Sequence, residues 1–311
     1  MKTHNSNIVE NSPEEKQLGI VAVDLHNFLQ MNLPPRENLL NPWLPKSGIC
    51  MIYAKRGVGK TFFALEVAIA VSYGIPFLCF DAPKPSRVLY IDGEMPANVM
   101  QERLANIINR NNLNTNDALP YIITPDLQHN FMPNLSTSLG QESIREYTDK
   151  SDLIIVDNVS TLGGGIKENE AESWIPLQQW ALGLRRQSKT VLFIHHAGKS
   201  GTQRGTSKRE DILDTSIALK HPSDYEPSSG ACFEIHFEKA RSMTGESTNP
   251  IFCSLTDDGW HYNPIEENNY LKVINLASQG LTQGDIAAEL GLSKGYISKL
   301  FKRGKELGEI K

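Results

Sequence analysis

Several features that would set the chain apart from ordinary globular proteins are missing from its 311 residues. No apolar run approaches the ~20 residues that span a bilayer, and the first forty residues lack the basic start and apolar centre of a secretory signal. No internal repeat or low-complexity tract is visible. We therefore expect a cytoplasmic protein that is neither exported nor embedded in a membrane.

Cysteine is also scarce. The four cysteines, Cys50, Cys79, Cys232 and Cys253, lie far apart in the sequence. This spacing differs from the paired pattern of a zinc site and from the density of a disulfide scaffold. A reducing compartment suits such a sequence best.

The chain has no overall excess of positive charge. Its net charge of −5 at first argues against nucleic acid as a partner, because phosphate backbones attract Lys and Arg. The average hides an asymmetry, since residues 270–311 contain seven Lys and Arg against four Asp and Glu. The C-terminal stretch is therefore basic while the rest is acidic.

The most informative stretch is Ala54–Thr61, with the sequence Ala-Lys-Arg-Gly-Val-Gly-Lys-Thr. It follows an apolar run at 49–53, expected to be a strand, and precedes a helix expected over about 60–73. Glycines in such a turn let backbone N–H groups converge on phosphates, Lys60 reaches the β and γ phosphates, and the Thr61 hydroxyl can bind Mg²⁺. The sequence thus predicts a site for ATP and Mg²⁺. The predicted nucleotide-binding residues are Lys55, Arg56, Gly57, Val58, Gly59, Lys60, Thr61 and Phe62.

One position departs from the usual phosphate-binding pattern, which begins with glycine where this chain has Ala54. We expect a modest effect, because Gly57 and Gly59 still serve the tight part of the turn, where a Cβ would block the phosphate. A chance match in an unrelated loop is the alternative. The expected strand before it and helix after it argue against chance.

The order of elements predicts an α/β fold. Strands that are apolar on both faces, expected at 87–91, 153–156 and 190–194, alternate with amphipathic helices, which indicates a mostly parallel sheet covered on both sides. Beyond residue 210, period-two alternation and turn-rich joints indicate antiparallel edge strands. We predict a lead or docking segment over residues 1–40 and a nucleotide-binding core over 41–264.

Acidic residues at two strand ends are expected to complete the site. Asp157 follows the strand 153–156. A carboxylate at the end of a buried strand beside a phosphate-binding loop usually holds Mg²⁺, directly or through water. The alternative role for Asp157 is capping of the next turn. After the strand 87–91, Glu94 can polarise the attacking water as a general base, whereas Asp92 could cap the turn or join the metal. We favour Glu94 as the base.

Further catalytic candidates lie at other strand ends. His195 and His196 end the strand 190–194, where ligands gather in open α/β sheets, so either could sense the γ-phosphate or be an ordinary strand-end histidine. Lys239 and Arg241 point to one side of the chain. They could neutralise charge on the transferred phosphate of a neighbouring subunit or form a solvated pair. The catalytic candidates are Lys60, Glu94, His195, Lys239 and Arg241.

Residues of about 41–262 together resemble the RecA-like ATPases, in particular the RepA branch of plasmid-encoded hexameric replicative helicases. The resemblance implies that Glu94 is the catalytic glutamate and that Asp157 is the second acidic strand-end residue. It also implies that Lys239 and Arg241 reach the adjacent subunit's ATP site in a homo-oligomeric ring, expected to be a hexamer. The motifs that carry it are Tyr53–Thr61, Leu89–Pro96, Leu153–Asn158, Ile194–His196 and the turn Arg204–Ser207.

The C-terminal residues 268–311 have helix-turn-helix spacing. Ala287 is small where two helices would touch, Gly291 makes the turn, and Thr282 and Ser293 mark the helix starts. The stretch resembles the helix-turn-helix of bacterial regulators, whose second helix enters the major groove. A charged helical hairpin for protein contact is the alternative. The predicted DNA-binding residues are Lys294, Tyr296, Ser298, Lys299, Lys302 and Arg303.

These features predict a ring ATPase that engages DNA and unwinds it or translocates on it, in the replication of a plasmid, phage or integrated element. A different class is a DNA-bound regulator or initiator whose ATP cycle only switches assembly. A small-molecule kinase would share the phosphate-binding loop. It would not account for the basic C-terminal stretch or for Lys239 and Arg241.

Overall fold

The computed structural model describes residues 20–115, 120–164, 174–198 and 211–310. Contacts divide the chain into two units, Met1–Arg36 and Glu37–Lys311. In the first unit, the short helix α1 (Leu25–Gln30) begins after Asp24, whose carboxylate accepts a hydrogen bond from the backbone N–H of Asn27. Its Leu25, Phe28 and Leu29 side chains are exposed.

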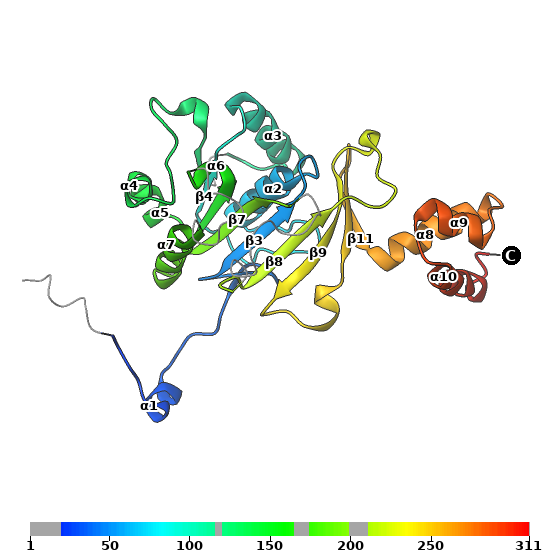
Figure 1. The fold of residues 1–311 in the computed structure, drawn as a ribbon, viewed down its shortest axis with the longest axis horizontal. Helices are drawn as coiled ribbons and strands as arrows, with labels where there is room; N and C mark the ends of the chain where they lie inside the picture. Colours follow the sequence, from blue (N-terminus) through cyan, green and yellow to red (C-terminus); the bar gives the residue numbers. More distant parts are fainter. Residues whose placement is uncertain (1–19, 116–119, 165–173, 199–210, 311) are drawn as a thin grey trace, which may run out of the picture. The chain divides into compact units, whose positions relative to one another are not determined.

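The described part of the second unit is built on a nine-stranded sheet with the strand order β11-β10-β9-β8-β3-β7-β6-β4-β5 (Figure 1). The strands from β8 to β5 in this order are parallel, and β9 to β11 continue the sheet in antiparallel fashion. The prediction of a mostly parallel sheet with antiparallel edge strands is therefore confirmed. The strands are β3 (Ile49–Ala54), β4 (Val88–Asp92), β5 (Tyr121–Ile123), β6 (Leu153–Asp157), β7 (Thr190–His196), β8 (Thr215–Lys220), β9 (Cys232–Ala240), β10 (Ile251–Thr256) and β11 (Gly259–Pro264).

Helices cover both faces of the sheet because successive strand residues point to opposite sides. In β3, Cys50 and Ile52 belong to the same buried cluster as the residues of α2 (Lys60–Tyr73), whereas Ile49 and Met51 belong to the cluster of α7 (Ile175–Arg186). The remaining helices of this part of the chain are α3 (Ala97–Arg110), α4 (Ser138–Ser143), α5 (Arg145–Lys150) and α6 (Val159–Leu162). The two short helices α4 and α5 follow each other directly, before β6.

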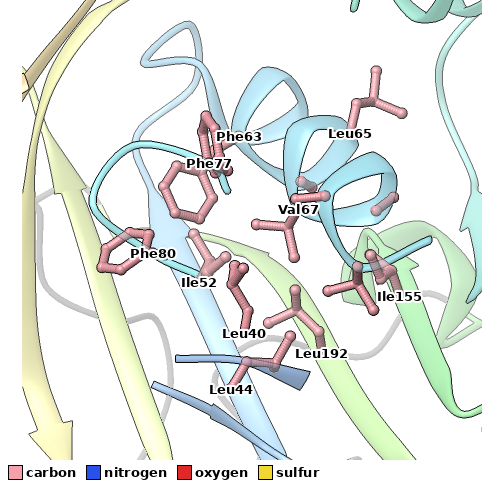
Figure 2. Close-up of a cluster of buried hydrophobic side chains, with 14 of the residues drawn as sticks. Leu40, Leu44, Ile52, Phe63, Leu65, Val67, Phe77, Phe80, Ile155 and Leu192 are labelled. Carbon is pink, nitrogen blue, oxygen red and sulfur yellow. The ribbon is translucent and has the colours of Figure 1, made fainter. Parts of the chain in front are cut away.

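The helix α2 is almost entirely buried. Figure 2 shows its Phe63 and Val67 side chains among apolar residues of the strands and of the segments before and after the helix. The ring of Phe63 lies 5.2 Å from that of Phe77, edge to face. Truncating a buried aromatic side chain costs about 3–5 kcal/mol, so this packing firmly fixes the first turn of α2. A small sheet of β1 (Asn38–Leu40) and β2 (Leu44–Pro45) contributes to the same cluster.

Three helices end the chain, α8 (Ile265–Ser278), α9 (Gln283–Leu290) and α10 (Lys294–Glu306), and they share a small apolar core. Thr282 and Asp285 form a capping box at the start of α9, and the Ser293 hydroxyl accepts a hydrogen bond from the N–H of Tyr296 at the start of α10. Gly291 makes the left-handed turn between them. Both helix starts predicted from the sequence are confirmed.

None of the described helices combines the length and the apolar character that a bilayer span requires.

Candidate active site

The loop between β3 and α2 opens onto a cavity of about 630 Å³. All six residues of β3 are buried, which anchors the loop at its start. Gly57 and Gly59 have φ values of +83° and +113°, a region that side-chain-bearing residues rarely adopt. A Cβ on Gly59 would also lie 3.3 Å from the ring of Phe233. Both the backbone angle and the space therefore call for glycine at position 59.

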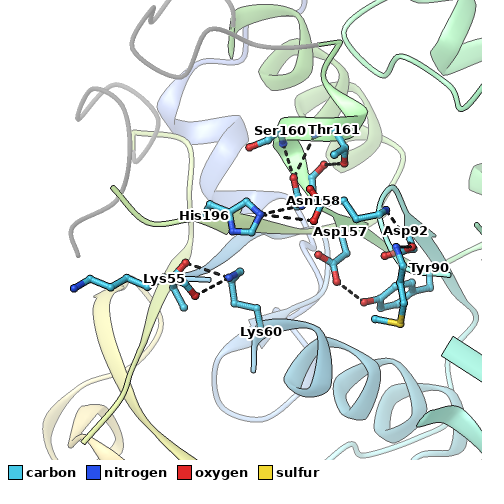
Figure 3. Close-up of polar contacts among 12 residues, drawn as sticks. Lys55, Lys60, Tyr90, Asp92, Asp157, Asn158, Ser160, Thr161 and His196 are labelled. Carbon is cyan, nitrogen blue, oxygen red and sulfur yellow. Dashed lines mark hydrogen bonds and ion pairs between the residues drawn. The ribbon is translucent and has the colours of Figure 1, made fainter. Parts of the chain in front are cut away.

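Lys60 is the buried cation of this cavity, with 6% of its surface exposed. Its Nζ donates hydrogen bonds to the carbonyls of Ala54 at 3.2 Å and Lys55 at 3.0 Å (Figure 3). Burial lowers the pKa of Lys60, and the nearby carboxylates of Asp157 and Glu94 oppose this by favouring the cation. A cation held on carbonyl groups beside an open cavity is well placed to bind phosphate oxygens.

Asp157 ends β6 on the α2 side of the sheet, and its side chain is buried. It accepts a hydrogen bond from the Tyr90 hydroxyl at 2.7 Å. Burial raises the pKa of Asp157, while hydrogen bonds from Tyr90 and Thr61 and the charge of Lys60 act in the opposite direction. The turn after the strand is capped by Asn158, whose side chain accepts from the N–H groups of Ser160 and Thr161. Asn158, rather than Asp157, therefore provides the side chain that caps this turn.

Thr61 and Asp157 both line the cavity, and their oxygens fit Mg²⁺. This ion takes oxygen ligands and is commonly bound by one or two carboxylates together with substrate phosphates. Among the residues that the structure describes, no group of three or more His, Cys, Asp or Glu side chains gathers as an all-protein metal site. One hydroxyl and one carboxylate, as Thr61 and Asp157 supply, suit a metal whose other ligands come from a phosphate.

The two acids after β4 have different surroundings. The Asp92 carboxylate is buried and accepts from the N–H groups of Glu94 at 3.2 Å and Met95 at 2.6 Å, so it caps the turn. Burial, together with nearby Asp157, raises the pKa of Asp92 to about 6. The Glu94 side chain is 46% exposed and lines the cavity, with its carboxylate 3.9 Å from Nε2 of His196.

The paired histidines at the end of β7 lie on opposite faces of the sheet. His196 lines the cavity, and its Nε2 is 3.2 Å from the side-chain nitrogen of Asn158 (Figure 3). His195 is 1% exposed and points to the other face of the sheet. Phe193 lies on that face and packs with α7. The structure thus brings His196 to the loop and places His195 away from it. Successive side chains of a strand point to alternate faces, and Ile194 points to the α2 face. This alternation is the sequence signal that could have distinguished His196 from His195.

Lys239 and Arg241 lie at the other end of the sheet from the loop. Lys239 pairs with Ser216 of β8, which pairs with Met51 near the start of β3. The backbone N–H of Arg241 donates to Asp214, and its guanidinium donates to the Asp211 carbonyl at 2.6 Å. Ala231, which lines the cavity, lies eight residues before Lys239 and ten before Arg241, and the extended strand β9 spans most of this separation, about 26–33 Å at about 3.3 Å per residue. Neither residue can therefore reach the cavity of its own chain.

Residues that the sequence did not point to form much of the remaining wall. Arg103 of α3 lines the cavity and holds its guanidinium 4.1 Å over the ring of Phe62. Tyr225, Gly230 and Ala231 line it from the connection between β8 and β9. That connection is rich in Pro, Ser and Gly, so its sequence indicated only a turn.

Most of the predicted nucleotide-binding residues line the cavity, with two exceptions. Lys55 is exposed and Val58 is buried in the core. The turn Arg204–Ser207, one of the motifs of the resemblance, falls within residues 199–210, outside the described residues.

The predicted DNA-binding residues lie on α10 in unequal settings. Lys294, Ser298 and Lys302 are exposed. Lys299 is paired with Glu266 at 3.0 Å, and Arg303 is paired with Glu267 at 2.8 Å and stacks over Tyr270. Tyr296 packs against the small core of the three helices.

A phosphate-binding loop at the edge of a largely parallel sheet, with acids at neighbouring strand ends, defines a P-loop nucleoside triphosphatase. The family model AAA_25, described as an AAA domain, matches residues 14–202, more than half of the chain. The chain belongs to this family and is a P-loop ATPase of the AAA and RecA-like kind. No curated protein matches the sequence.

Proposed function

We propose that the chain is a DNA-engaging ring ATPase, a RepA-like replicative helicase or translocase of a plasmid or another mobile element. The observation that carries the proposal is that one chain combines an ATPase site with a basic helix at its C-terminal end. Lys60, Thr61, Glu94 and Asp157 surround one cavity, and the chain ends in helices whose α10 exposes basic residues. ATP is the substrate, Mg²⁺ the cofactor and DNA the partner.

Each side chain has a defined task in hydrolysis. Lys60 and the N–H groups at the start of α2 hold the phosphates. Thr61 and Asp157 would hold Mg²⁺, which when bound neutralises charge on the β and γ phosphates. Glu94, the exposed acid at the cavity, orients the attacking water and accepts its proton. His196, which contacts both Asn158 and Glu94, positions these two groups.

The ring form of the proposal rests on Lys239 and Arg241. Both lie far from the cavity of their own chain, so a role in neutralising the transferred phosphate requires a second copy of the chain. We propose that the protein assembles as a hexamer in which these residues reach the neighbouring ATP site. Residues 41–264 would supply the ATPase domain and 268–311 a helix-turn-helix.

A second candidate is an ATP-switched DNA-binding regulator or replication initiator without unwinding activity. It is favoured by the contact of the β8–β9 connection with the C-terminal helices, where the Ser223 hydroxyl donates to the Leu290 carbonyl at 2.9 Å. The same connection lines the cavity through Tyr225. A switch of this kind would bind a duplex without displacing its strands.

Hydrolysis and strand displacement separate the two candidates. A motor should hydrolyse ATP several-fold faster with single-stranded DNA and displace a strand from a forked duplex. A switch should do neither and still bind duplex DNA through α10. Light scattering with a non-hydrolysable ATP analogue should show assembly of the wild type and none of Lys60→Ala. A wild type that stays monomeric with the analogue contradicts the ring.

A further inference from the structure

One part of the cavity wall is left without a role by the proposed chemistry. It is formed by the β8–β9 connection, residues 221–231, through Tyr225, Gly230 and Ala231. The volume of about 630 Å³ lies in the range of sites that enclose whole small molecules. The space beyond the phosphates can therefore hold more of the ligand.

Tyr225 is the aromatic side chain of this wall, and its ring is held in place. It stacks on the ring of His221 with a centroid distance of 3.5 Å and an interplanar angle of 16°. The Tyr225 hydroxyl donates to the carbonyl of Gly230 at 3.3 Å, and Nδ1 of His221 lies 3.1 Å from the carbonyl of Cys232. A ring fixed before binding loses little conformational entropy when a planar ligand settles on it.

The loop that carries Tyr225 is also tied down from outside. Ser223 donates its hydrogen bond to the Leu290 carbonyl, and Asp224 forms an ion pair with Lys272 at 2.5 Å. The second aromatic ring in the described cavity wall, Phe62, already carries the guanidinium of Arg103. Tyr225 lines the cavity and has one face of its ring on His221.

We propose that Tyr225 is the platform on which the base of the bound nucleotide stacks. The proposal rests on the proposed binding of ATP at the phosphate-binding loop, and it names the residue that distinguishes a nucleotide from a bare polyphosphate. Aromatic rings stack on nucleobases without needing a particular pattern of hydrogen bonds. Tyr225 would thus strengthen binding of nucleotides in general rather than select adenine.

Titration calorimetry of the full chain with two magnesium-loaded ligands tests this role. One is a non-hydrolysable ATP analogue and the other is inorganic tripolyphosphate, which has the charge but no base. For Tyr225→Ala we expect the Kd for the analogue to rise about tenfold or more, with the Kd for tripolyphosphate unchanged. Tyr225→Phe, which keeps the ring, should bind both ligands as the wild type does.

Tyr262→Ala is the matched control, because Tyr262 is a surface tyrosine of β11, 43% exposed and outside the described cavity wall. It should leave both constants unchanged. Equal weakening of both ligands in Tyr225→Ala would mean that the ring only supports the loop, and no weakening would mean that the base lies elsewhere. Either result overturns the stacking role while ATP binding stands. A wild type that binds neither ligand overturns the proposed function together with this role.

Discussion

The hydroxyl of Ser223 donates a hydrogen bond of 2.9 Å to the carbonyl of Leu290, the last residue of α9. Carbonyl groups at the end of a helix have no partner within the helix, so this contact satisfies one of them. A Cβ on Gly291, in the turn that follows, would lie 3.8 Å from the Cβ of Ser223. One connection of the ATPase core thus contacts both the nucleotide cavity and the turn between the two C-terminal helices.

This contact predicts that nucleotide and DNA affect each other's binding. A ligand that binds against Tyr225 acts on the same connection that Ser223 ties to α9, and such coupling is reciprocal and typically about 5- to 150-fold in affinity. The affinity for a labelled mixed-sequence duplex, measured by fluorescence anisotropy, should differ with and without a non-hydrolysable ATP analogue. Ser223→Ala should bring the ratio of the two affinities close to one. Ser228→Ala, on the same connection but facing Glu226, should keep the wild-type ratio. An unchanged ratio in Ser223→Ala contradicts the coupling.

The roles of Lys60 and Glu94 can be separated by binding and turnover. Lys60→Ala should abolish uptake of ATP in calorimetry, because the phosphates lose their buried cation. Glu94→Gln should keep that uptake and lower phosphate release by about 10²- to 10⁴-fold, the usual contribution of a general base. Glu102→Gln changes an exposed glutamate of α3 and should behave as the wild type. Near-normal turnover in Glu94→Gln would assign the base elsewhere.

Arg241 should act on a neighbouring subunit, so its loss should be repaired by mixing. Arg241→Ala alone is expected to bind ATP and to lose turnover. Mixed with Glu94→Gln, it should regain part of the activity, because a subunit with Glu94 intact then meets a neighbour with Arg241 intact. Phosphate release across a series of mixing ratios measures this. Normal turnover in Arg241→Ala, or no recovery at any ratio, would count against the role in trans.

The basic residues of α10 should differ in their contributions to DNA binding and to stability. Lys294 and Lys302 are exposed, so replacing either with Ala should weaken duplex binding and reduce the slope of log affinity against log salt by about one. Arg303 contacts Glu267 and Tyr270, so Arg303→Ala should mainly lower the melting temperature. Anisotropy over a salt series and thermal unfolding distinguish these effects. An unchanged salt slope in both lysine variants would favour a protein partner for α10.

The parts of the fold that could be predicted are those specified by neighbouring residues. The apolar runs of β3 and β7 and the caps at Thr282 and Ser293 are local signals, and the structure has the elements where those signals place them. The phosphate-binding loop is equally local, because its glycines are required by the backbone angles of the loop itself.

The remaining features depend on residues distant in sequence. The antiparallel register of β9 carries Lys239 to the far end of the sheet, and a turn-rich sequence gave no sign that Tyr225 would line the cavity. The carboxylates of Glu266 and Glu267 pair with Lys299 and Arg303 from more than thirty residues away, which a count of basic residues could not reveal. Sequence patterns indicate which element a side chain belongs to, and tertiary packing decides what it contacts.

Glu66 should link the stability of the fold to pH. This buried residue of α2 pairs with Arg110 of α3 and accepts a hydrogen bond from Nε1 of Trp260 at 2.7 Å. Burial raises the pKa of Glu66 above its ordinary 4.5, so over a pH range above 4.5 the folded chain binds a proton more tightly than the unfolded chain. The free energy of unfolding contributed by this group therefore falls as pH rises through that range.

Urea unfolding of the wild type and of Glu66→Gln at several pH values tests this sign. The stability of the wild type relative to Glu66→Gln should decrease as pH rises from about 4.5 toward neutrality, because glutamine has no charge to desolvate. Glu66→Ala should cost about 3–5 kcal/mol at neutral pH, since it leaves the partly buried Arg110 without its partner. Glu142→Gln, on the exposed surface of α4, supplies the matched control. A difference between wild type and Glu66→Gln that stays constant with pH would show that the carboxyl keeps its ordinary pKa despite burial, with Arg110 and Trp260 compensating fully for the loss of water.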